Sequence, residues 1–331
     1  MPQPPARAGG TLPALTDVLT SAASYAQDEK AASTRRGYRS DWRDFSAWCD
    51  RMGLEPLPAS PATAAAYFAH LADSGRSAGT IARRVAAIAY AHKLKGADSP
   101  TTAEAVRQVL RGIRRRIGVA PRQKAPATDR AIGAMLAHSG AHNEGSIWAI
   151  RDKALLLLGF AAALRRSELV DLKVNDLEFT PDGVLVHIRR SKTDQEGAGA
   201  IVAIPRGGRL RPVEAIEAWL RTVESNQTGN PGQSVNRPLF RSIDRHGNIG
   251  TAPLSGQAIA DIIKRHAAAA GLDPVIFSGH SLRAGFVTSA LEHGADIFKV
   301  MDVTRHKRVE TLKGYDRRAQ IFKNHAGKNF L

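Results

Sequence analysis

Seven polar side chains in the second half of the chain are of types that could act on a phosphate ester. In chain order they are Arg165, Glu168, Lys192, His280, Arg283, His306 and Tyr315. Arginine donates paired hydrogen bonds to phosphate oxygens, and histidine and lysine can transfer protons. A tyrosine hydroxyl can attack phosphorus and hold it covalently. These residue types together suit phosphoryl transfer onto a side chain.

Each of these residues, taken alone, also has an ordinary explanation. His280 and Arg283 stand three residues apart at the expected start of a helix, where they could hold an anion or merely cap the helix. Arg165 follows an apolar helix and could be a charge at its C-terminus, or a half-buried group aimed at a phosphate. Lys192 lies in a polar loop, where most lysines are solvated, and Tyr315 could be a core side chain. Only their combination is specific.

The order of these motifs resembles the tyrosine recombinase (phage integrase) family. The shared order is Arg-x-x-Glu, a lysine between two strands, His-x-x-Arg, a histidine, and a tyrosine nine residues later. The resemblance covers nearly the whole chain and is strongest over residues 159–317. It implies that Arg165 and Arg283 form the arginine pair, and that Lys192, His280 and His306 complete the catalytic set. It also implies that Tyr315 is the nucleophile and that Glu168 supports the site.

The resemblance implies a metal-independent reaction that needs no cofactor and no ATP. The hydroxyl of Tyr315 would attack a DNA phosphodiester, giving a 3′-phosphotyrosyl bond and a free 5′-hydroxyl. His280 is the better candidate to accept the tyrosine proton, and Lys192 would protonate the leaving oxygen. His306 would bond the scissile phosphate. The two arginines would stabilise the added negative charge of the transition state.

Two positions depart from the family pattern. Ala163 stands where the family often has glycine before Leu-Arg, and Arg305 stands where glycine is common before the histidine. Neither position supplies a catalytic group, so the departures question the local loop geometry more than the activity. Arg305 could contact DNA.

The segments around these motifs predict a mainly α-helical protein with a small antiparallel β-sheet, an α+β fold in two domains. Residues 1–14 are expected to be a disordered tail, because their composition cannot bury a core. Residues 15–118 predict a four-helix domain, which the resemblance identifies as a SAM-like core-binding domain. Helix caps are expected at Ser33 or Thr34, Ser60, Thr80 and Ser99. Residues 119–127 predict a basic linker, and residues 128–331 the catalytic domain.

The C-terminal region alternates between helical and strand patterns. Thr128 is expected to cap a helix, and residues 147–164 form an apolar, central one. Alternating residues 184–188 predict a strand, and residues 200–204 predict the strand that returns beside it. Further helices are expected near residues 212–223, 256–270, 282–293, 298–303 and 309–316.

The composition indicates a polyanionic partner. The chain has 331 residues and a formal net charge of +16, which favours double-stranded DNA. Residues 76–124 hold twelve lysines and arginines against two acidic residues. The residues expected to contact DNA are Arg83, Arg84, Arg111, Arg114, Arg115, Arg116, Arg122, Lys124, Arg305 and Lys307.

Other classes of protein fit less well. The longest apolar run, residues 154–164, is too short to cross a bilayer. The single cysteine, Cys49, rules out an internal disulfide framework or a cysteine-based zinc site. We therefore expect a soluble, cytoplasmic, nucleoid-associated protein without membrane or metal partners. Family members work as tetramers on two DNA sites, and apolar residues after Tyr315 could dock either on a neighbouring subunit or on their own domain.

Two alternatives remain open from the sequence. A type IB topoisomerase uses similar Arg, Lys, His and Tyr chemistry without strand exchange. A non-catalytic regulator could keep the fold and only bind DNA, although the full set of catalytic residue types argues against it. The sequence does not reveal the DNA target, the accessory proteins, or whether the role is integration, excision, transposition or dimer resolution.

Overall fold

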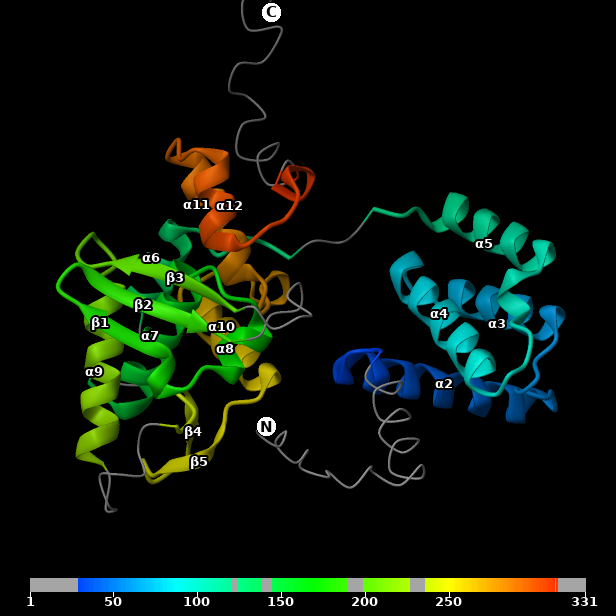
Figure 1. Ribbon diagram of the computed structural model, residues 1–331, viewed down its shortest axis with the longest axis horizontal. Coiled ribbons are helices and arrows are strands. Elements are labelled where there is room, and N and C mark those ends of the chain that lie inside the picture. Colours follow the sequence, from blue (N-terminus) through cyan, green and yellow to red (C-terminus); the bar gives the residue numbers. More distant parts are fainter. Residues whose placement is uncertain are drawn as a thin grey trace, which may run out of the picture. The chain divides into compact units, whose positions relative to one another are not determined.

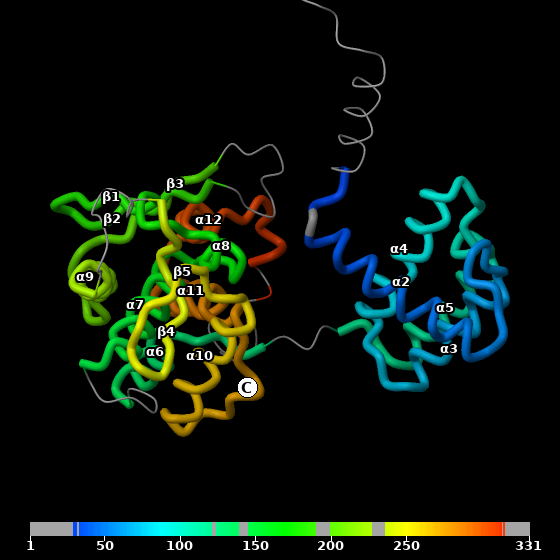
Figure 2. The backbone as a smooth tube through the Cα atoms, turned by 90° about the horizontal axis from the view of Figure 1, so that it is seen from below, coloured from blue at the N-terminus to red at the C-terminus, as the bar shows by residue number. Residues whose placement is uncertain are grey.

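The computed structural model describes residues 29–120, 124–138, 145–189, 199–226, 236–312 and 314. The chain divides into two compact units, residues 1–122 and 123–331 (Figure 1, Figure 2). The expected tail and three expected functional residues, Arg122, Lys192 and Tyr315, lie outside the described residues. In the part that is described, no helix is long and apolar enough to cross a membrane.

The N-terminal unit is built of helices throughout its described part. These are α2 (Ala32–Met52), α3 (Pro61–Asp73), α4 (Ala78–Leu94), the short 3₁₀ helix η1 (Pro100–Thr102) and α5 (Glu104–Ile117). Ser60 caps α3 as expected, because its hydroxyl accepts from the Thr63 amide at 3.0 Å. The cap of α4 is Ser77, not Thr80, and Ser99 caps η1 rather than α5. The α2 helix follows Ala31, without a side-chain cap.

Aromatic side chains from α2 and α3 form the centre of this unit. Phe45, Tyr67 and Phe68 are fully buried, and the Phe45 and Tyr67 ring centroids lie 4.9 Å apart. Arg84 enters the same core from α4, where its guanidinium bonds to Asp44 and to the Tyr67 hydroxyl. This arginine therefore ties α4 to α2 and α3.

The C-terminal unit combines helices with two small sheets. Its elements are α6 (Asp129–Ala137), α7 (Ile147–Ala161), α8 (Arg166–Asp171), η2 (Val174–Asp176), β1 (Leu177–Thr180), β2 (Gly183–Ile188), β3 (Ala200–Pro205), α9 (Pro212–Ser225), β4 (Arg241–Ile243), β5 (Ile249–Pro253), α10 (Gly256–Ala269), η4 (Pro274–Ile276), α11 (Ser281–Glu292) and α12 (Ile297–Thr304). Thr128 caps α6, as expected. The expected helices from residue 212 onward are confirmed as far as residue 312.

The larger sheet has three antiparallel strands in the order β1-β2-β3. The expected strand pair is present, with Val184 opposite Ile204 and Val186 opposite Val202. These four side chains are buried, so one face of the sheet packs on the core. Strand β1 and the separate pair β4-β5 have no clear signal in the sequence, because these strands are short and partly exposed.

Helix α7 runs through the core of the C-terminal unit and packs against α9 and α11 (Figure 2). Gly159 permits the close approach of α11, since a Cβ at this position would lie 2.6 Å from the Leu282 side chain. Asp152 is fully buried on α7, and its carboxylate accepts from Arg265 at 2.5 Å and bonds to His266 at 3.2 Å. The same core thus fixes α7 against α10 and α11.

The second half of the expected linker belongs to the C-terminal unit. The Ala125 amide donates to the Ile276 carbonyl, and the Ala127 amide donates to the Ser281 carbonyl, each at 2.8 Å. Ala127 is fully buried. Gly285 on α11 makes room for this segment, because a Cβ there would lie 1.8 Å from the Ala127 carbonyl oxygen. The described chain is therefore fixed to the C-terminal unit before residue 128.

Candidate active site

The first arginine, Arg165, follows the end of α7. The amide of Ala163 donates to Phe160, and that of Leu164 donates to Gly159, a hydrogen-bond pattern that closes a helix through a left-handed residue. Ala163 is that residue, with φ of 47°. Glycine normally takes such a position, because the left-handed conformation costs other residues roughly 1–2 kcal/mol. The chain then turns sharply, and Arg165 stands at the start of α8.

The Glu168 carboxylate bonds to both the backbone amide and the side chain of Arg165. Its Oε2 accepts from the Arg165 amide at 2.8 Å, and its Oε1 accepts from Arg165 Nη1 at 2.6 Å. The Glu168 side chain is 1% exposed and the Arg165 side chain 13%. Burial acts to raise the pKa of Glu168, but the Arg305 charge and the bonds from Arg165 outweigh it and hold the pKa below its ordinary value. Glu168 is therefore an anion at neutral pH.

The second arginine, Arg283, lies one turn into α11 and is buried. Its Nη1 donates to the Ala163 carbonyl at 2.7 Å, and its Nη2 donates to the Thr304 carbonyl. These carbonyls belong to the ends of α7 and α12, and α12 lies beside α11 (Figure 1). Arg283 therefore joins the segments that carry Arg165 and His306.

Helix α12 ends in the same manner as α7. Arg305 is left-handed, with φ of 58°, and the His306 amide donates back to the Met301 carbonyl at 3.3 Å. The two family glycine positions, 163 and 305, are thus the two left-handed helix ends that precede Arg165 and His306. Both positions keep the left-handed backbone conformation that glycine favours, although the residues here are alanine and arginine.

The hydrogen bonds of His306 fix its tautomer. Arginine can only donate, so the contact of 3.2 Å between Arg283 Nη2 and His306 Nε2 makes Nε2 an acceptor. The proton of the neutral ring is then on Nδ1, which donates to Thr304 Oγ1 at 2.7 Å. The Thr304 hydroxyl donates in turn to the Val300 carbonyl at 2.7 Å. This chain of bonds orients the imidazole beside Arg283.

Burial and three positive charges keep His306 neutral. Desolvation contributes most to lowering its pKa to about 4, followed by the charges of Arg283, Arg165 and Arg305. Arg165 and Arg283 come from positions 118 residues apart in the chain, yet both act on this ring. The structure thus gathers a strongly positive site around one imidazole, as an anion-binding site requires.

Five of the seven residues selected from the sequence are described. Arg165, Glu168, Arg283 and His306 are brought together by the contacts above. His280 precedes α11 and is exposed, and its amide donates to Ser278 Oγ at 3.3 Å. The predicted proton donor Lys192 and the predicted nucleophile Tyr315 lie outside the described residues, so their roles stay predictions.

The residues expected to contact DNA fall into two groups. Arg114, Arg115, Arg116 and Lys307 are exposed, as are Arg83, which is paired with Asp41, Arg111, which is paired with Glu104, and Lys124. Arg84 and Arg305 are different, because both guanidinium groups are largely buried and bonded to carboxylates. The structure gives these two arginines internal contacts instead.

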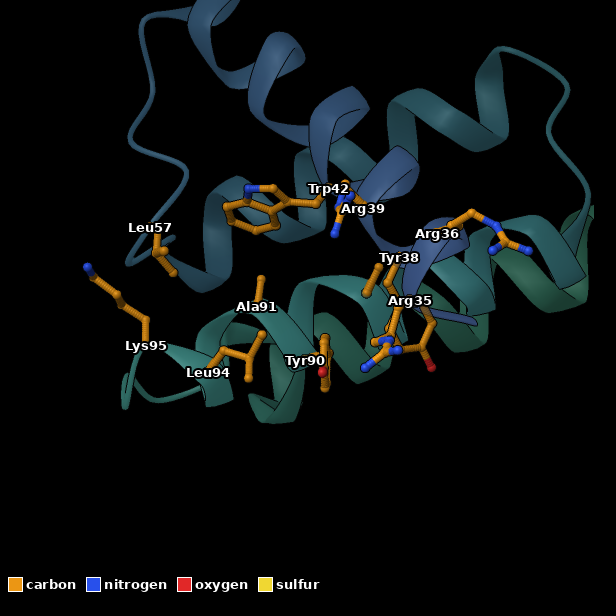
Figure 3. A pocket seen from close by; sticks show the side chains of 11 residues that line it. Arg35, Arg36, Tyr38, Arg39, Trp42, Leu57, Tyr90, Ala91, Leu94 and Lys95 are labelled. Carbon is orange, nitrogen blue, oxygen red and sulfur yellow. The ribbon is translucent and has the colours of Figure 1, made fainter. Parts of the chain in front are cut away.

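A pocket on the N-terminal unit contains basic residues that the sequence analysis did not select. It has a volume of about 920 Å³ and is lined by α2 and α4, with Arg36 and Arg39 on one side and Tyr90 and Lys95 on the other (Figure 3). The local density of basic residues after residue 76, which predicted the DNA contacts, does not extend to the arginines of α2. A helical-wheel comparison of α2 with α4 could have found the pocket.

Comparisons with known proteins show the family to which this chain belongs. A model of the phage integrase family matches residues 128–320. The integrase/recombinase XerD homologue of Selenomonas ruminantium is 38% identical over 305 residues, which cover 91% of this chain and 86% of that protein. The Cre recombinase of Escherichia phage P1 is 25% identical over 287 residues, which cover 83% and 81% of the two chains.

Solved structures share the fold. The Tn1549 transposon integrase in complex with transposon right end DNA has a TM-score of 0.59 at 15% identity, covering 92% of this chain and 97% of that one. A lambda integrase dimer bound to a core site also has a TM-score of 0.59, at 16% identity, covering 91% and 77%. With the family match over most of the C-terminal unit and a relative alignable over most of its length, this chain belongs to the phage integrase family of tyrosine recombinases.

Proposed function

We propose that this chain is a site-specific DNA recombinase that cuts and rejoins duplex DNA through a covalent bond to Tyr315. The observation that carries the proposal is the meeting of Arg165, Arg283 and His306 around one site, although they come from three separate segments. Positive groups fixed in advance at a site of developing negative charge are commonly the largest contribution to catalysis.

The reaction exchanges one phosphoester for another. The Tyr315 oxygen bonds to phosphorus as the bond from phosphorus to the 5′-oxygen breaks, and the leaving oxygen takes a proton from Lys192. His280 accepts the tyrosine proton. The 5′-hydroxyl of another strand then attacks the phosphotyrosine in the reverse sense, which restores the tyrosine and leaves a joined strand. The number of phosphoester bonds is unchanged throughout, so no energy source is consumed.

His306 is expected to change protonation when DNA binds. In the structure the His306 Nε2 accepts from Arg283, whereas a phosphate oxygen can only accept. A phosphate anion beside the ring offsets the arginine charges and raises the pKa of His306. The protonated ring then donates from Nε2 to the phosphate while Nδ1 stays bonded to Thr304.

DNA is the partner, and we include in the proposal a homotetramer that holds two DNA sites in the cytoplasm. The exposed basic residues of α5 and the basic pocket between α2 and α4 are proposed to contact the phosphate backbone. Residues 15–118 would act as the core-binding domain and residues 128–331 as the catalytic domain. Crosslinking of the full chain on its DNA site, followed by mass measurement, tests the tetramer.

A trapping assay tests the chemistry directly. The full chain is mixed with nicked duplexes tiled across the DNA that flanks its gene, with chelator present, and the reaction is stopped with detergent. We expect a slow-migrating, protease-sensitive DNA band with the wild type and none with Tyr315→Phe. Adducts that persist in Tyr315→Phe would refute the nucleophile.

Two other results would support the alternative hypotheses. Salt-sensitive retention of one duplex without any adduct would support a regulator that binds but does not cut. Relaxation of every supercoiled plasmid, without preference for a site, would support a topoisomerase.

A further inference from the structure

Arg305 occupies a position where its backbone conformation favours glycine. It ends α12 with φ of 58°, and its side chain is only 12% exposed. A non-glycine residue in a left-handed turn is retained where other interactions compensate for the strain. The contacts of the Arg305 side chain therefore indicate what the residue contributes.

Those contacts lead to the carboxylate that holds Arg165. Arg305 Nη2 donates to Glu168 Oε2 at 2.7 Å, and this same oxygen accepts the Arg165 amide at 2.8 Å. The other oxygen, Oε1, is left for the Arg165 guanidinium at 2.6 Å. Arg305 Nη1 also donates to the Val303 carbonyl at 3.0 Å. The Arg305 guanidinium is thus held by a carbonyl at the end of its own helix, and it fixes the position of Glu168 Oε2.

We propose that Arg305 is a positioning residue for the catalytic arginine: it fixes the buried carboxylate of Glu168, and Glu168 in turn fixes Arg165 for the phosphate. This inference rests on the proposed function. It replaces the expectation that Arg305 contacts DNA. Arginine suits the task because its planar group can bond a carboxylate and a carbonyl at once, whereas lysine offers a single point charge.

The arrangement also explains how a buried carboxylate can stay charged. Glu168 is almost fully buried, and the charged groups in contact with it among the described residues are Arg165 and Arg305. Without the Arg305 charge, the effect of burial would raise the pKa of Glu168, so the carboxyl would accept a proton more readily. A protonated Glu168 would accept fewer bonds from Arg165, and the arginine would lose its fixed orientation.

The test compares variants of the full chain on the nicked duplex identified by trapping. Arg305→Gly removes the side chain in a residue type that favours this turn, so the variant is expected to fold. Its cleavage rate should fall roughly ten- to a hundredfold, the range found when outer partners of metal ligands are removed. The acid side of its pH–rate profile should move to higher pH. Arg305→Lys, which keeps the charge, should restore the profile and part of the rate.

The decisive comparison repeats the Arg305→Gly substitution in a chain that already carries Glu168→Gln. In Glu168→Gln, adding Arg305→Gly should have little further effect on the rate or its pH dependence, because the carboxylate through which Arg305 acts is absent. An equal loss in both backgrounds would overturn the proposal. This comparison also separates Glu168 from His306, whose ionisation is sensitive to the same arginine but remains present in the Glu168→Gln chain.

Lys307→Ala is the matched control for direct DNA contact. Lys307 is exposed two residues away, and its loss should reduce the salt dependence of DNA affinity by about one phosphate contact, with an unchanged pH profile. Arg305→Gly should leave the salt dependence unchanged. If Arg305→Gly instead behaves like Lys307→Ala, Arg305 contacts DNA and does not position Arg165.

A measurement without DNA keeps this inference distinct from the proposed function. The Glu168 carboxyl can be followed by carbon-13 NMR in chains with labelled glutamate, with Glu168→Gln assigning the signal. Its pKa should be higher in Arg305→Gly than in the wild type, and an unchanged pKa would contradict the contact. If the wild type forms no adduct on any duplex, the proposed function fails while this measurement still decides whether Arg305 controls Glu168.

Discussion

At the scale of single residues, the site depends on charges that control one another. Arg305 and Arg165 keep Glu168 ionised, and the three arginines help to keep His306 neutral. Thr304 and Arg283 fix the orientation of the His306 ring from either side. The site therefore favours an anion, because its acidic group is already paired with arginines and Arg283 adds a further positive charge beside the imidazole.

The lowered pKa of His306 has a consequence for stability. Between pH 6.5 and about 4 the imidazole binds a proton in the unfolded chain but not in the folded one, so folding stability falls as the pH falls through this range. We expect this loss to be smaller in His306→Gln, by on the order of 1 kcal/mol after allowance for solvent screening of a half-buried ring. Urea unfolding of both chains at several pH values measures the difference. Parallel curves would mean that the ring titrates normally.

At the scale of elements, two helix ends and one close contact place the catalytic groups. The left-handed ends of α7 and α12 present Arg165 and His306, and α11 supplies Arg283 between them. Helix α11 is held from its other side by the segment before α6, whose Ala127 lies against Gly285. The position of Arg283 therefore depends on a contact that is remote from its own hydrogen bonds.

Gly285→Ala tests that dependence. The added methyl group would meet the Ala127 carbonyl oxygen at 1.8 Å, so the backbone must move. Overpacking of this kind costs typically 1–3 kcal/mol, and we expect thermal unfolding at a lower temperature together with slower cleavage. Gly133→Ala on α6, where a Cβ has open space, is the control. It should unfold at the same or a slightly higher temperature than the wild type, because alanine favours a helix more than glycine does, and it should cleave like the wild type. Equal behaviour of the two variants would show that the segment can shift without disturbing α11.

At the scale of the whole molecule, the net charge of +16 governs the encounter with DNA. Helix α5 has one face packed on the core through Val106, while Arg114, Arg115 and Arg116 at its end are exposed. Charges so placed can neutralise phosphates without taking part in the reaction. We therefore expect them to contribute to affinity for any DNA sequence.

Replacing Arg114, Arg115 and Arg116 together by alanine should weaken DNA binding and make it less sensitive to salt. Each phosphate contact contributes about 0.9 to the slope of log affinity against log salt concentration, so the slope should decrease by about 2–3. Anisotropy titrations of a labelled duplex at several salt concentrations measure it. Replacing Arg209, Arg221 and Arg245 together, which are three exposed arginines of the C-terminal unit, controls for net charge. An equal change there would show that the effect is not specific to α5.

The sequence alone determined the family and most of the helices of this protein. The order of Arg165, Lys192, His280, Arg283, His306 and Tyr315 is specific because the reaction needs several residue types at once, and the family match confirms the resemblance. Caps such as Ser60 and Thr128 were predictable because they depend on local hydrogen bonds. The strands β2 and β3 were predictable because one face of each is buried.

Only the tertiary structure decided what several residues contact. Strand β1 was missed because a short, exposed strand has no hydrophobic pattern and is stabilised by its partner. Arg84 and Arg305 were expected to contact DNA, but each is bonded to a carboxylate from another part of the chain. Such pairings depend on distances between segments far apart in sequence, which local patterns do not contain. The meeting of Arg165, Arg283 and His306 is of the same kind, since it requires α7, α11 and α12 to pack together.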